Sequence, residues 1–555
     1  MSWLSYCYKT YQNSVSEIGK QQPGKVPLLP VAHTTQQVNI EVELDKDGNF
    51  QYAGLLAQDQ RTTIIPCTEE SSARTSGMVP HPLVDKLQYI AADYPTFGGS
   101  KESGWPLYHK QLQAWCTSPY AHPAVCTVLH YLEKECLIAD LVKANILFID
   151  ENGTLPTKWQ GNKEDKPPIL DTLTGSDQTE SFVRFRVDNV DLSRDTTVRE
   201  SFIRFYETQL KDIDYCTVQG IKMPVSTLSP YKIRNPGDRA KLISSNDNTN
   251  YTYRGRFADA AQALSIGYET TQKAHSALRW LVSKQGVNTG DQTVLVWGTQ
   301  NEAVPNVLGD TLDIAQEYNP LAGDDWDDFE EDTERLPADT QEEIARQFNR
   351  AILGYQHQLK DNSQTAVMIL DSATPGRLSI RYYQELQGSK LLANIKDWHD
   401  TFQWQLEYRS VEEPTELGKK PKIKKVVFVG VPAPADIAKA AYGEKVDAKL
   451  KQATIERLIP CITNGERFPR DLMISAVDRA TNSIGLDYWE QQKTQNIACA
   501  LVRGYYHRNK KVDYPMNVDE TIKDRNYLFG RILACAEQIE RRALIQQGNE
   551  NEKRL

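Results

Sequence analysis

The sequence lacks most of the motifs by which soluble enzymes are recognised. It contains no GxxxxGK[ST] phosphate-binding loop, and the GxSxG, HExxH and protein-kinase motifs are missing as well. The glycine-rich stretch FGGSKESG, residues 97–104, has its lysine and serine in the wrong order for a phosphate-binding loop and indicates a surface loop. No nucleophile is paired with a base. We therefore predict no catalytic residue and no cofactor.

The nine cysteines are scattered and form no CxxC pair, which argues against a disulfide framework or a zinc ribbon. One arrangement keeps a metal site open. His122, Cys126 and His130 are spaced four residues apart, so on a helix they share one face, and Cys116 and Cys136 lie on either side. The valines and leucines between them favour a helix packed in the core, so no metal is predicted.

Long apolar runs are absent too, which predicts no transmembrane helix, and the first residues do not resemble a signal peptide. A cytoplasmic protein without a membrane partner is expected. The net charge of −10 argues at first against nucleic-acid binding, but residues 324–334 hold eight acids, and the rest of the chain carries only −2. We interpret this acidic run as a solvated loop; the alternative is a loop that docks a partner or mimics DNA.

Sequence periodicity predicts a mixed α+β fold. Residues 37–66, 181–187 and 293–298 alternate or run apolar in the way of strands, and ILFID at 146–150 is predicted as a further strand. Residues 259–286 have helical spacing. After about residue 442 the pattern is almost entirely helical. We predict a domain boundary near Gly443, with an α+β body over residues 1–443 and a helical bundle over residues 444–555.

Basic residues cluster in two places. KKPKIKK, residues 419–425, holds five lysines that suit either an edge strand protected against aggregation or a nucleic-acid contact. The helical region carries a further set of cations, which solvated helix faces or a groove for a nucleic-acid backbone would explain. The residues predicted to contact a displaced strand or backbone are Lys424, Arg470, Arg479, Lys493, Arg503 and Arg508.

The polar loop SSNDNTNYTYRGRF, residues 244–257, is the most distinctive short stretch. It combines three asparagines, two tyrosines and two arginines with few apolar anchors, and YKIRNPGDRAKLI precedes it. Asparagine amides read base edges, arginines contact phosphates or guanines, and tyrosines stack or wedge. The composition indicates a nucleic-acid contact.

Several long segments carry a resemblance to a known family. KLISSNDNTNYTYRGRFADAAQALSIGYETTQKAHSALRWLVSKQG resembles the hallmark stretch of the Csd-type CRISPR-associated large subunit of the subtype I-C surveillance complex, Cascade. SARTSGMVPHPLVDKLQY, FVRFRV, VMILDSATPGRLSIRYYQEL, PAPADIAKAAYG, ERFPRDLMISAVDRATN, GLDYWE and TQNIACALVR follow the order of the family. The resemblance spans nearly the whole chain.

The resemblance implies a non-catalytic subunit beside the crRNA-bound backbone subunits and the subunit that caps the 5′ handle. Such a subunit recognises the protospacer-adjacent motif of target double-stranded DNA, guides the displaced strand in the R-loop, and recruits a helicase–nuclease in trans. It further implies a small helical subunit made by internal initiation, for which Met473 is suitably placed, and helical sequence beyond Leu555. The acidic run is not part of the family pattern.

Within the matched segments the resemblance implies a set of DNA-contacting residues in two loops. The residues expected to read the motif, wedge the duplex or hold phosphates are Lys241, Asn246, Asn248, Asn250, Tyr253, Arg254 and Arg256, with Arg74, Thr75 and Ser76 as second candidates. Two other functions stay open: a metal-dependent nuclease that uses scattered acids and histidines such as Asp371 and His130, or a purely structural scaffold.

Overall fold

The protein was analysed as a computed structural model that divides into two compact units. The first comprises Met1–Asn306 with Leu353–Leu392, and the second Val307–Ile352 with Ala393–Leu555. Both contain helices and strands, which confirms the predicted α+β class. The expected boundary at Gly443 falls inside the second unit. The structure describes residues 2–74, 77–98, 101–156, 159, 166–173, 175, 177–235, 237–243, 257, 260–317, 340–359, 362–374, 376–412, 422–482 and 486–546.

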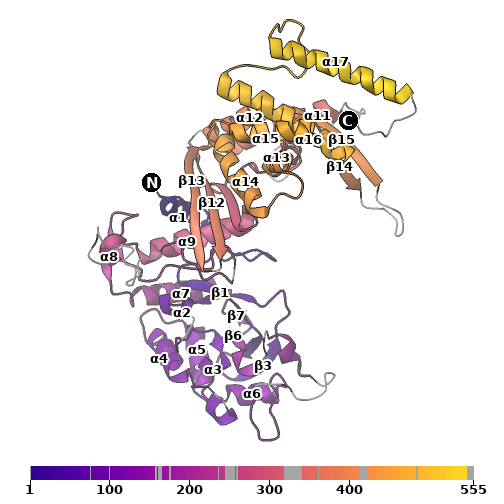
Figure 1. The fold of residues 1–555 in the computed structure, drawn as a ribbon. Coiled ribbons are helices and arrows are strands. Elements are labelled where there is room, and N and C mark those ends of the chain that lie inside the picture. Colours follow the sequence, from indigo (N-terminus) through magenta and orange to yellow (C-terminus); the bar gives the residue numbers. More distant parts are fainter. Residues whose placement is uncertain are drawn as a thin grey trace, which may run out of the picture. The chain divides into compact units, whose positions relative to one another are not determined.

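One core of the first unit surrounds a mixed sheet of strand order β3-β2-β6-β5, with β7 paired to β6. The strands are β2 (Ile40–Leu44), β3 (Phe50–Leu55), β5 (Asp85–Lys86), β6 (Phe182–Val187) and β7 (Val190–Asp191). Beside it lie the hairpin-like pair β1 (His33–Gln37) and β4 (Thr62–Pro66) and the helices α2 (Glu69–Ser72), α3 (Leu87–Ile90), α4 (Trp105–Cys116), α5 (Pro123–Leu132), α6 (Leu137–Lys143) and α7 (Thr196–Glu207) (Figure 1).

The alternating pattern of β2 and β6 explains how these two strands pair. They run parallel, with Glu41 opposite Arg184 and Glu43 opposite Arg186. The Arg184 Nε donates to Glu41 Oε2 at 2.7 Å, and the Arg186 Nε donates to Glu43 Oε2 at the same distance. Cross-strand ion pairs therefore occupy one face, while the apolar residues of both strands enter the core.

A second core of the first unit is built on an antiparallel sheet of order β10-β11-β12-β13. The strands are β10 (Val287–Thr289), β11 (Gln292–Gly298), β12 (Gln364–Thr374) and β13 (Arg377–Gln387). Helix α9 (Tyr268–Gln285) contacts β11 and also packs against α1 (Trp3–Asn13), as Figure 1 shows. All of β11 is buried, and the Trp297 indole donates to Thr10 Oγ1 of α1 at 3.2 Å. The helix α8 (Ala260–Ala263) and the paired strands β8 (Ile213–Tyr215) and β9 (Lys222–Pro224) complete this part.

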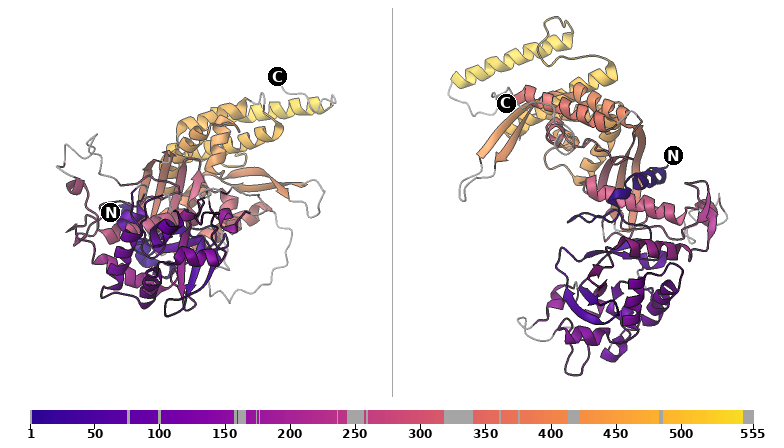
Figure 2. Two further views of the ribbon diagram at one scale, coloured as in Figure 1. Left: turned by 90° about the horizontal axis from the view of Figure 1, so that it is seen from below. Right: turned by 180° about the vertical axis from the view of Figure 1, so that it is seen from behind.

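The second unit combines helices with one two-stranded hairpin, which projects from them in both views of Figure 2. The hairpin is β14 (Trp404–Glu412) and β15 (Lys422–Gly430). Helices α11 (Thr340–Gln358) and α12 (Gly388–Phe402) belong mostly to this unit, and the end of α11 and the start of α12 are counted in the first. The other helices are α10 (Thr311–Glu317), α13 (Pro434–Tyr442), α14 (Ala448–Thr463), α15 (Arg470–Thr481), α16 (Tyr488–Tyr505) and α17 (Arg525–Gln546). No helix in the described ranges has the length and hydropathy needed to cross a bilayer.

Close packing in the second unit depends on one glycine. Gly504 of α16 is buried, and a Cβ atom built there would lie 2.1 Å from Cδ1 of Phe402. The Phe402 ring in turn stacks on Trp398 at a centroid distance of 4.0 Å and contacts Phe468 at 5.1 Å. Because protein interiors are close-packed, the absence of a side chain at 504 brings the helix backbone against this aromatic cluster.

The predicted strand at 146–150 is wrong. The backbone there forms turns after α6, and the Ile146 N–H donates to Leu141 O at 2.9 Å. The Phe148 N–H donates to Gln178 Oε1 at 2.9 Å, and the Gln178 amide donates back to Phe148 O at 3.0 Å. The Gln178 side-chain amide thus bonds the backbone groups of Phe148 that a neighbouring strand would otherwise bond. A short apolar run does not by itself determine whether its backbone pairs in a sheet, which is why the prediction failed.

Buried neutral histidines should make the first unit acid-sensitive. Burial lowers the pKa of His33, His81 and His275 to about 4 in each case, below the ordinary value near 6.5. The unfolded chain therefore binds more protons below pH 6.5, and stability that is complete above that pH is lost as the pH falls towards 4. We expect a loss of about 2 kcal/mol per histidine at pH 5. Urea unfolding between pH 7.5 and 5 measures this, and His275→Gln should remove about one proton from the slope; an unchanged slope would contradict the assignment.

Candidate nucleic-acid interface

Most of the residues expected to read DNA lie outside the described part of the chain. This applies to Thr75 and Ser76 of the RTSG loop and to Asn246, Asn248, Asn250, Tyr253, Arg254 and Arg256 of the polar loop. Their assignments stay predictions. Of the expected readers, Arg74 and Lys241 are described, and Lys241 is half-buried. The site can therefore be built from the segments that lead into the two loops.

Arg74, the first residue of the RTSG stretch, is held by an internal ion pair. Its two terminal nitrogens donate to the two carboxylate oxygens of Asp85 at 2.8 and 3.0 Å, and one of them also donates to Val79 O at 2.9 Å. The guanidinium lies 4.6 Å from the centroid of the Tyr89 ring, and Asp85 is fully buried. These contacts occupy both terminal nitrogens of Arg74, so the DNA contact expected of Arg74 would have to use its remaining donors.

The segment that leads into the polar loop is tied to α2. The buried carboxylate of Glu69 accepts hydrogen bonds from the backbone N–H groups of Thr227 at 3.3 Å and Leu228 at 3.0 Å, and from the hydroxyl of Ser226. Residues 226–228, which precede the polar loop in the sequence, are therefore anchored to α2 through the Glu69 side chain, five residues before Arg74.

A short closed loop then presents two cations. The Lys232 N–H donates to Asp238 O at 3.1 Å, and Lys232 has a left-handed backbone with φ 62°. This bond sets Lys232 beside Arg239, which is exposed, while Lys232 is half-buried. The Asp238 carboxylate faces Asn235, accepting from its backbone N–H at 3.1 Å and from its amide at 3.3 Å.

Arg279 of α9 affects Lys232 through its charge. That charge lowers the pKa of Lys232, after the larger effect of burial, and burial lowers the pKa of Arg279 itself. The Nε atom of Arg279 is buried and has no hydrogen-bond partner. None of Lys232, Arg239 and Arg279 forms an ion pair with a carboxylate within the described ranges. The sequence did not single out Arg279, which is a lone cation in the apolar helical segment SALRWLV.

The residues expected along the helical region differ in their environment. Arg470 is exposed, whereas Arg479 donates to Thr494 Oγ1 at 3.0 Å and Lys493 donates to Asp436 Oδ1 at 2.8 Å. The Arg503 side chain donates to the carbonyl oxygen of Thr401 at 2.9 Å. Lys424 lies in β15, in register with Ser410 of β14. Of these residues, only an exposed cation could contact a nucleic-acid backbone without first breaking a contact inside the protein.

Arg508 lies in the interior of the second unit. One terminal nitrogen donates to Cys461 O at 2.6 Å, and the other donates to Asp397 Oδ2 at 2.6 Å. The guanidinium carbon is 5.5 Å from the ring centroid of Trp398 and 5.4 Å from that of Phe402. These contacts are those of a residue that stabilises the fold.

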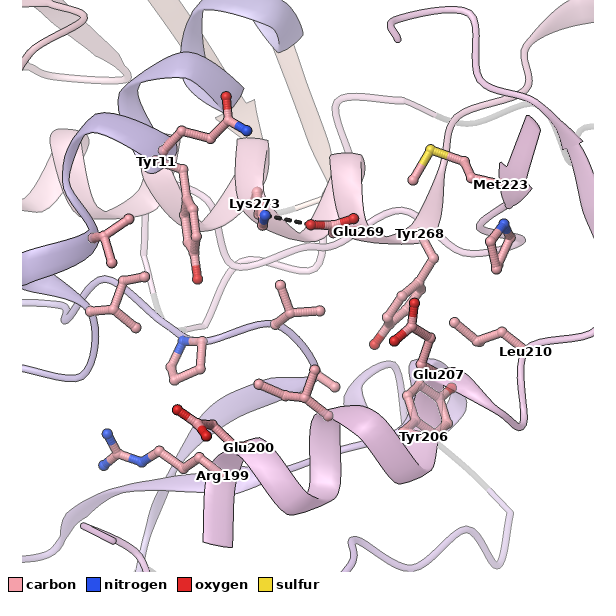
Figure 3. A pocket seen from close by; sticks show the side chains of 18 of the residues that line it. Tyr11, Arg199, Glu200, Tyr206, Glu207, Leu210, Met223, Tyr268, Glu269 and Lys273 are labelled. Atoms are coloured by element: carbon pink, nitrogen blue, oxygen red, sulfur yellow. Dashed lines mark ion pairs between the residues drawn. The ribbon is translucent and has the colours of Figure 1, made fainter. Parts of the chain in front are cut away.

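A cavity of about 940 Å³ lies between α1, α7, β9 and the start of α9 (Figure 3). Its walls are largely apolar and aromatic, and Tyr206 and Tyr268 meet edge to face at 5.6 Å. Lys273 pairs with Glu269, and burial raises the pKa of Tyr206 to about 12. The described residues that line the cavity include no histidine, cysteine or serine. Its chemistry suits an apolar ligand better than a nucleophilic reaction.

The metal arrangement weighed from the sequence does not assemble in the described ranges, where no three potential ligands come together. His122 is placed 3.1 Å from Thr197 Oγ1, and the Cys126 thiol points to Cys116 O at 3.9 Å. Asp371, one of the acids weighed for a nuclease, lies within β12, and its carboxylate accepts from the Gln292 amide at 3.2 Å. Strand β12 ends three residues later at Thr374, which pairs with Arg377.

Comparison with known proteins bears directly on identity. The chain matches the family described as CRISPR-associated protein (Cas_Csd1) over residues 7–554, which is nearly its whole length. No curated protein matches it. The match covers both compact units and both loops expected to contact DNA. This chain belongs to the Cas_Csd1 family of CRISPR-associated proteins.

Proposed function

We propose that this protein is the non-catalytic large subunit of a subtype I-C RNA-guided surveillance complex. In that complex it recognises the protospacer-adjacent motif of target double-stranded DNA, stabilises the R-loop and its displaced strand, and recruits a helicase–nuclease in trans. Family membership over residues 7–554 carries the proposal. The composition of the polar loop and the cations that lead into it support it.

The division of labour follows from RNA-guided recognition. Base pairing with the guide reads the target sequence, so the protein needs only a few side chains for a short duplex motif and contacts for the backbone. Asparagine amides suit base edges, and arginines suit phosphates. The partners that the proposal requires are the crRNA-bound backbone subunits, the handle-capping subunit and a small helical subunit.

The test is binding of the reconstituted complex to target duplexes with and without the adjacent motif, at two salt concentrations. The double variant Asn246→Ala/Asn248→Ala should lose about 1–3 kcal/mol of motif discrimination per base contact while assembly with guide RNA survives. Asn349→Ala, which removes an exposed asparagine of α11, is the matched control and should leave discrimination unchanged. A wild-type complex without motif preference would contradict the proposal and favour a structural scaffold.

The competing function is a metal-dependent nuclease. It predicts divalent-metal-dependent DNA cleavage by the purified chain that Asp371→Asn or His130→Ala abolishes. We expect no such cleavage. A one-metal or two-metal site needs several ligands close together, and no three potential ligands come together in the described ranges.

A further inference from the structure

The cavity between α1, α7, β9 and the start of α9, which we call the α7–α9 cavity, is large and mostly apolar. Its volume of about 940 Å³ lies within the range of about 300–1,000 Å³ that is usual for ligand sites (Figure 3). The buried side chains of Ala32, Tyr206 and Tyr268 form part of its wall, and the two tyrosine rings meet edge to face at a centroid distance of 5.6 Å. Ile203 of α7 and Met223 of β9 add further apolar surface. A wall of this kind favours an apolar or aromatic side chain as its occupant.

Exposed apolar side chains continue from the cavity onto the neighbouring surface. Val15 and Ile221 line the cavity and are 63% and 57% exposed. In the paired strands β8 and β9, Ile213 is in register with Pro224, which also lines the cavity, and both Ile213 and Tyr215 are exposed. A small molecule bound inside the cavity would leave these side chains in water. Exposed apolar residues that adjoin a cavity are typical of a surface that contacts another protein.

Three acids and two cations line the α7–α9 cavity, and two of the acids have no ion-pair partner. Lys273 pairs with Glu269, and the guanidinium of Arg199 donates to a backbone carbonyl oxygen at 2.7 Å. Glu200 and Glu207 are exposed, and neither forms an ion pair in the described ranges. They lie seven residues apart on α7, which places them on one face of the helix. Unpaired carboxylates on one face attract basic groups and repel phosphate groups.

Tyr268 gives a second, independent indication of a ligand. Its buried side chain lines the cavity and extends from the start of α9 towards α7 (Figure 3). Its hydroxyl has no hydrogen-bond partner in the part of the chain that the structure describes, although most buried hydroxyls have one. The neighbouring Tyr206 hydroxyl shows the usual case, because it accepts from the Glu69 N–H at 2.8 Å. A peptide would offer the acceptor that Tyr268 lacks, since each of its residues carries a carbonyl oxygen.

We propose that the α7–α9 cavity docks a short segment of another protein. The segment inserts an aromatic or large aliphatic side chain between α7 and α9 and places lysine or arginine residues beside Glu200 and Glu207. The exposed apolar surroundings favour a protein over a small molecule, and the unpaired acids favour a basic segment over nucleic acid. This inference does not rest on the proposed function, because the described residues that line the cavity include none of those expected to contact DNA.

Selection of short random peptides, displayed on phage, against the full chain gives the first test. The enriched sequences should share an aromatic or large aliphatic residue within a few positions of lysine or arginine. One enriched peptide is then synthesised and titrated. Glu200→Lys/Glu207→Lys should weaken its binding roughly tenfold and should instead favour the same peptide with glutamate in place of its basic residues. Glu135→Lys/Glu151→Lys, which makes the same charge change at two exposed glutamates outside the cavity, is the control and should leave binding unchanged.

A second variant tests the apolar part of the site. Val15→Ser/Ile221→Ser changes two exposed side chains, so its Tm should match that of the wild type, and it should weaken the same peptide roughly fivefold. A single-stranded oligonucleotide should not displace the peptide, and displacement would assign the cavity to nucleic acid. That displacement, a selection that enriches acidic sequences or none, or peptide binding that survives both double variants would overturn the proposal.

Discussion

Asparagine in place of Asp85 is expected to lower the free energy of unfolding of the first unit by about 3–5 kcal/mol. The fully buried carboxylate accepts two hydrogen bonds from Arg74, one from the His81 N–H at 2.7 Å and one from the Lys86 N–H at 2.8 Å. In Asp85→Asn, the side-chain NH2 group would face N–H groups that now donate to the carboxylate. The buried guanidinium of Arg74 would also lose its counter-charge. Urea unfolding at pH 7.5 measures the change.

The control for this prediction is Asp471→Asn. Asp471 forms the same two-bond pair with Arg457, at 2.8 and 2.6 Å, but the two side chains are 58% and 44% exposed. Exposed ion pairs contribute little, so the loss should stay below about 1 kcal/mol. Equal losses in the two variants would show that burial does not set the value of the Arg74–Asp85 pair.

Alanine in place of Arg508 should lower the free energy of unfolding of the second unit by about 2–4 kcal/mol. The change leaves the buried Cys461 carbonyl without its charged donor and removes a guanidinium from the faces of Trp398 and Phe402. Asp397 is 56% exposed and stays solvated, so it adds little to the loss. Thermal and urea unfolding of the full chain give the size of the effect.

A comparison with Arg470→Ala separates stability from DNA binding. Arg470 is exposed, so its replacement should change stability by no more than about 0.5 kcal/mol. If the helical region tracks a DNA backbone, Arg470→Ala weakens oligonucleotide binding without a stability change. An Arg508→Ala variant that keeps its stability but loses DNA binding would contradict the structural role assigned to Arg508.

The fold was predictable where the periodicity of the sequence also sets burial. FVRFRV forms β6 because its alternation matches one face to Glu41 and Glu43 and the other to the core. Helix α9 ends at Gln285 with Gly286 as its C-cap, which agrees with the end of the helical spacing at residue 286. The apolar character of ILFID was evident from the sequence, but its irregular backbone was not. The group that hydrogen-bonds this backbone is the amide of Gln178, which is distant in sequence.

The sequence predicted which segments belong to the candidate site better than it predicted the role of single residues. The polar loop and the basic residues before it were recognisable by composition, but composition does not say which cation has an ion-pair or hydrogen-bond partner. Arg74 and Arg508 have the same residue type as Arg470, and only the positions of Asp85 and Cys461 distinguish them. Arg279 was missed because a single arginine in an apolar helix usually signals a satisfied core residue, and its unpaired Nε is visible only in three dimensions.

Gly504 has a consequence for how this family can vary. In an isolated helix, alanine would be favoured over glycine by about 1 kcal/mol, so local preference and tertiary packing disagree at this position. The Phe402 ring resolves the disagreement, because a methyl group at 504 would occupy its edge. The two positions are therefore epistatic: a larger residue at 504 is tolerated only together with a smaller one at 402. Homologous sequences that keep phenylalanine at 402 should keep glycine at 504, and those that lose one should have lost the other.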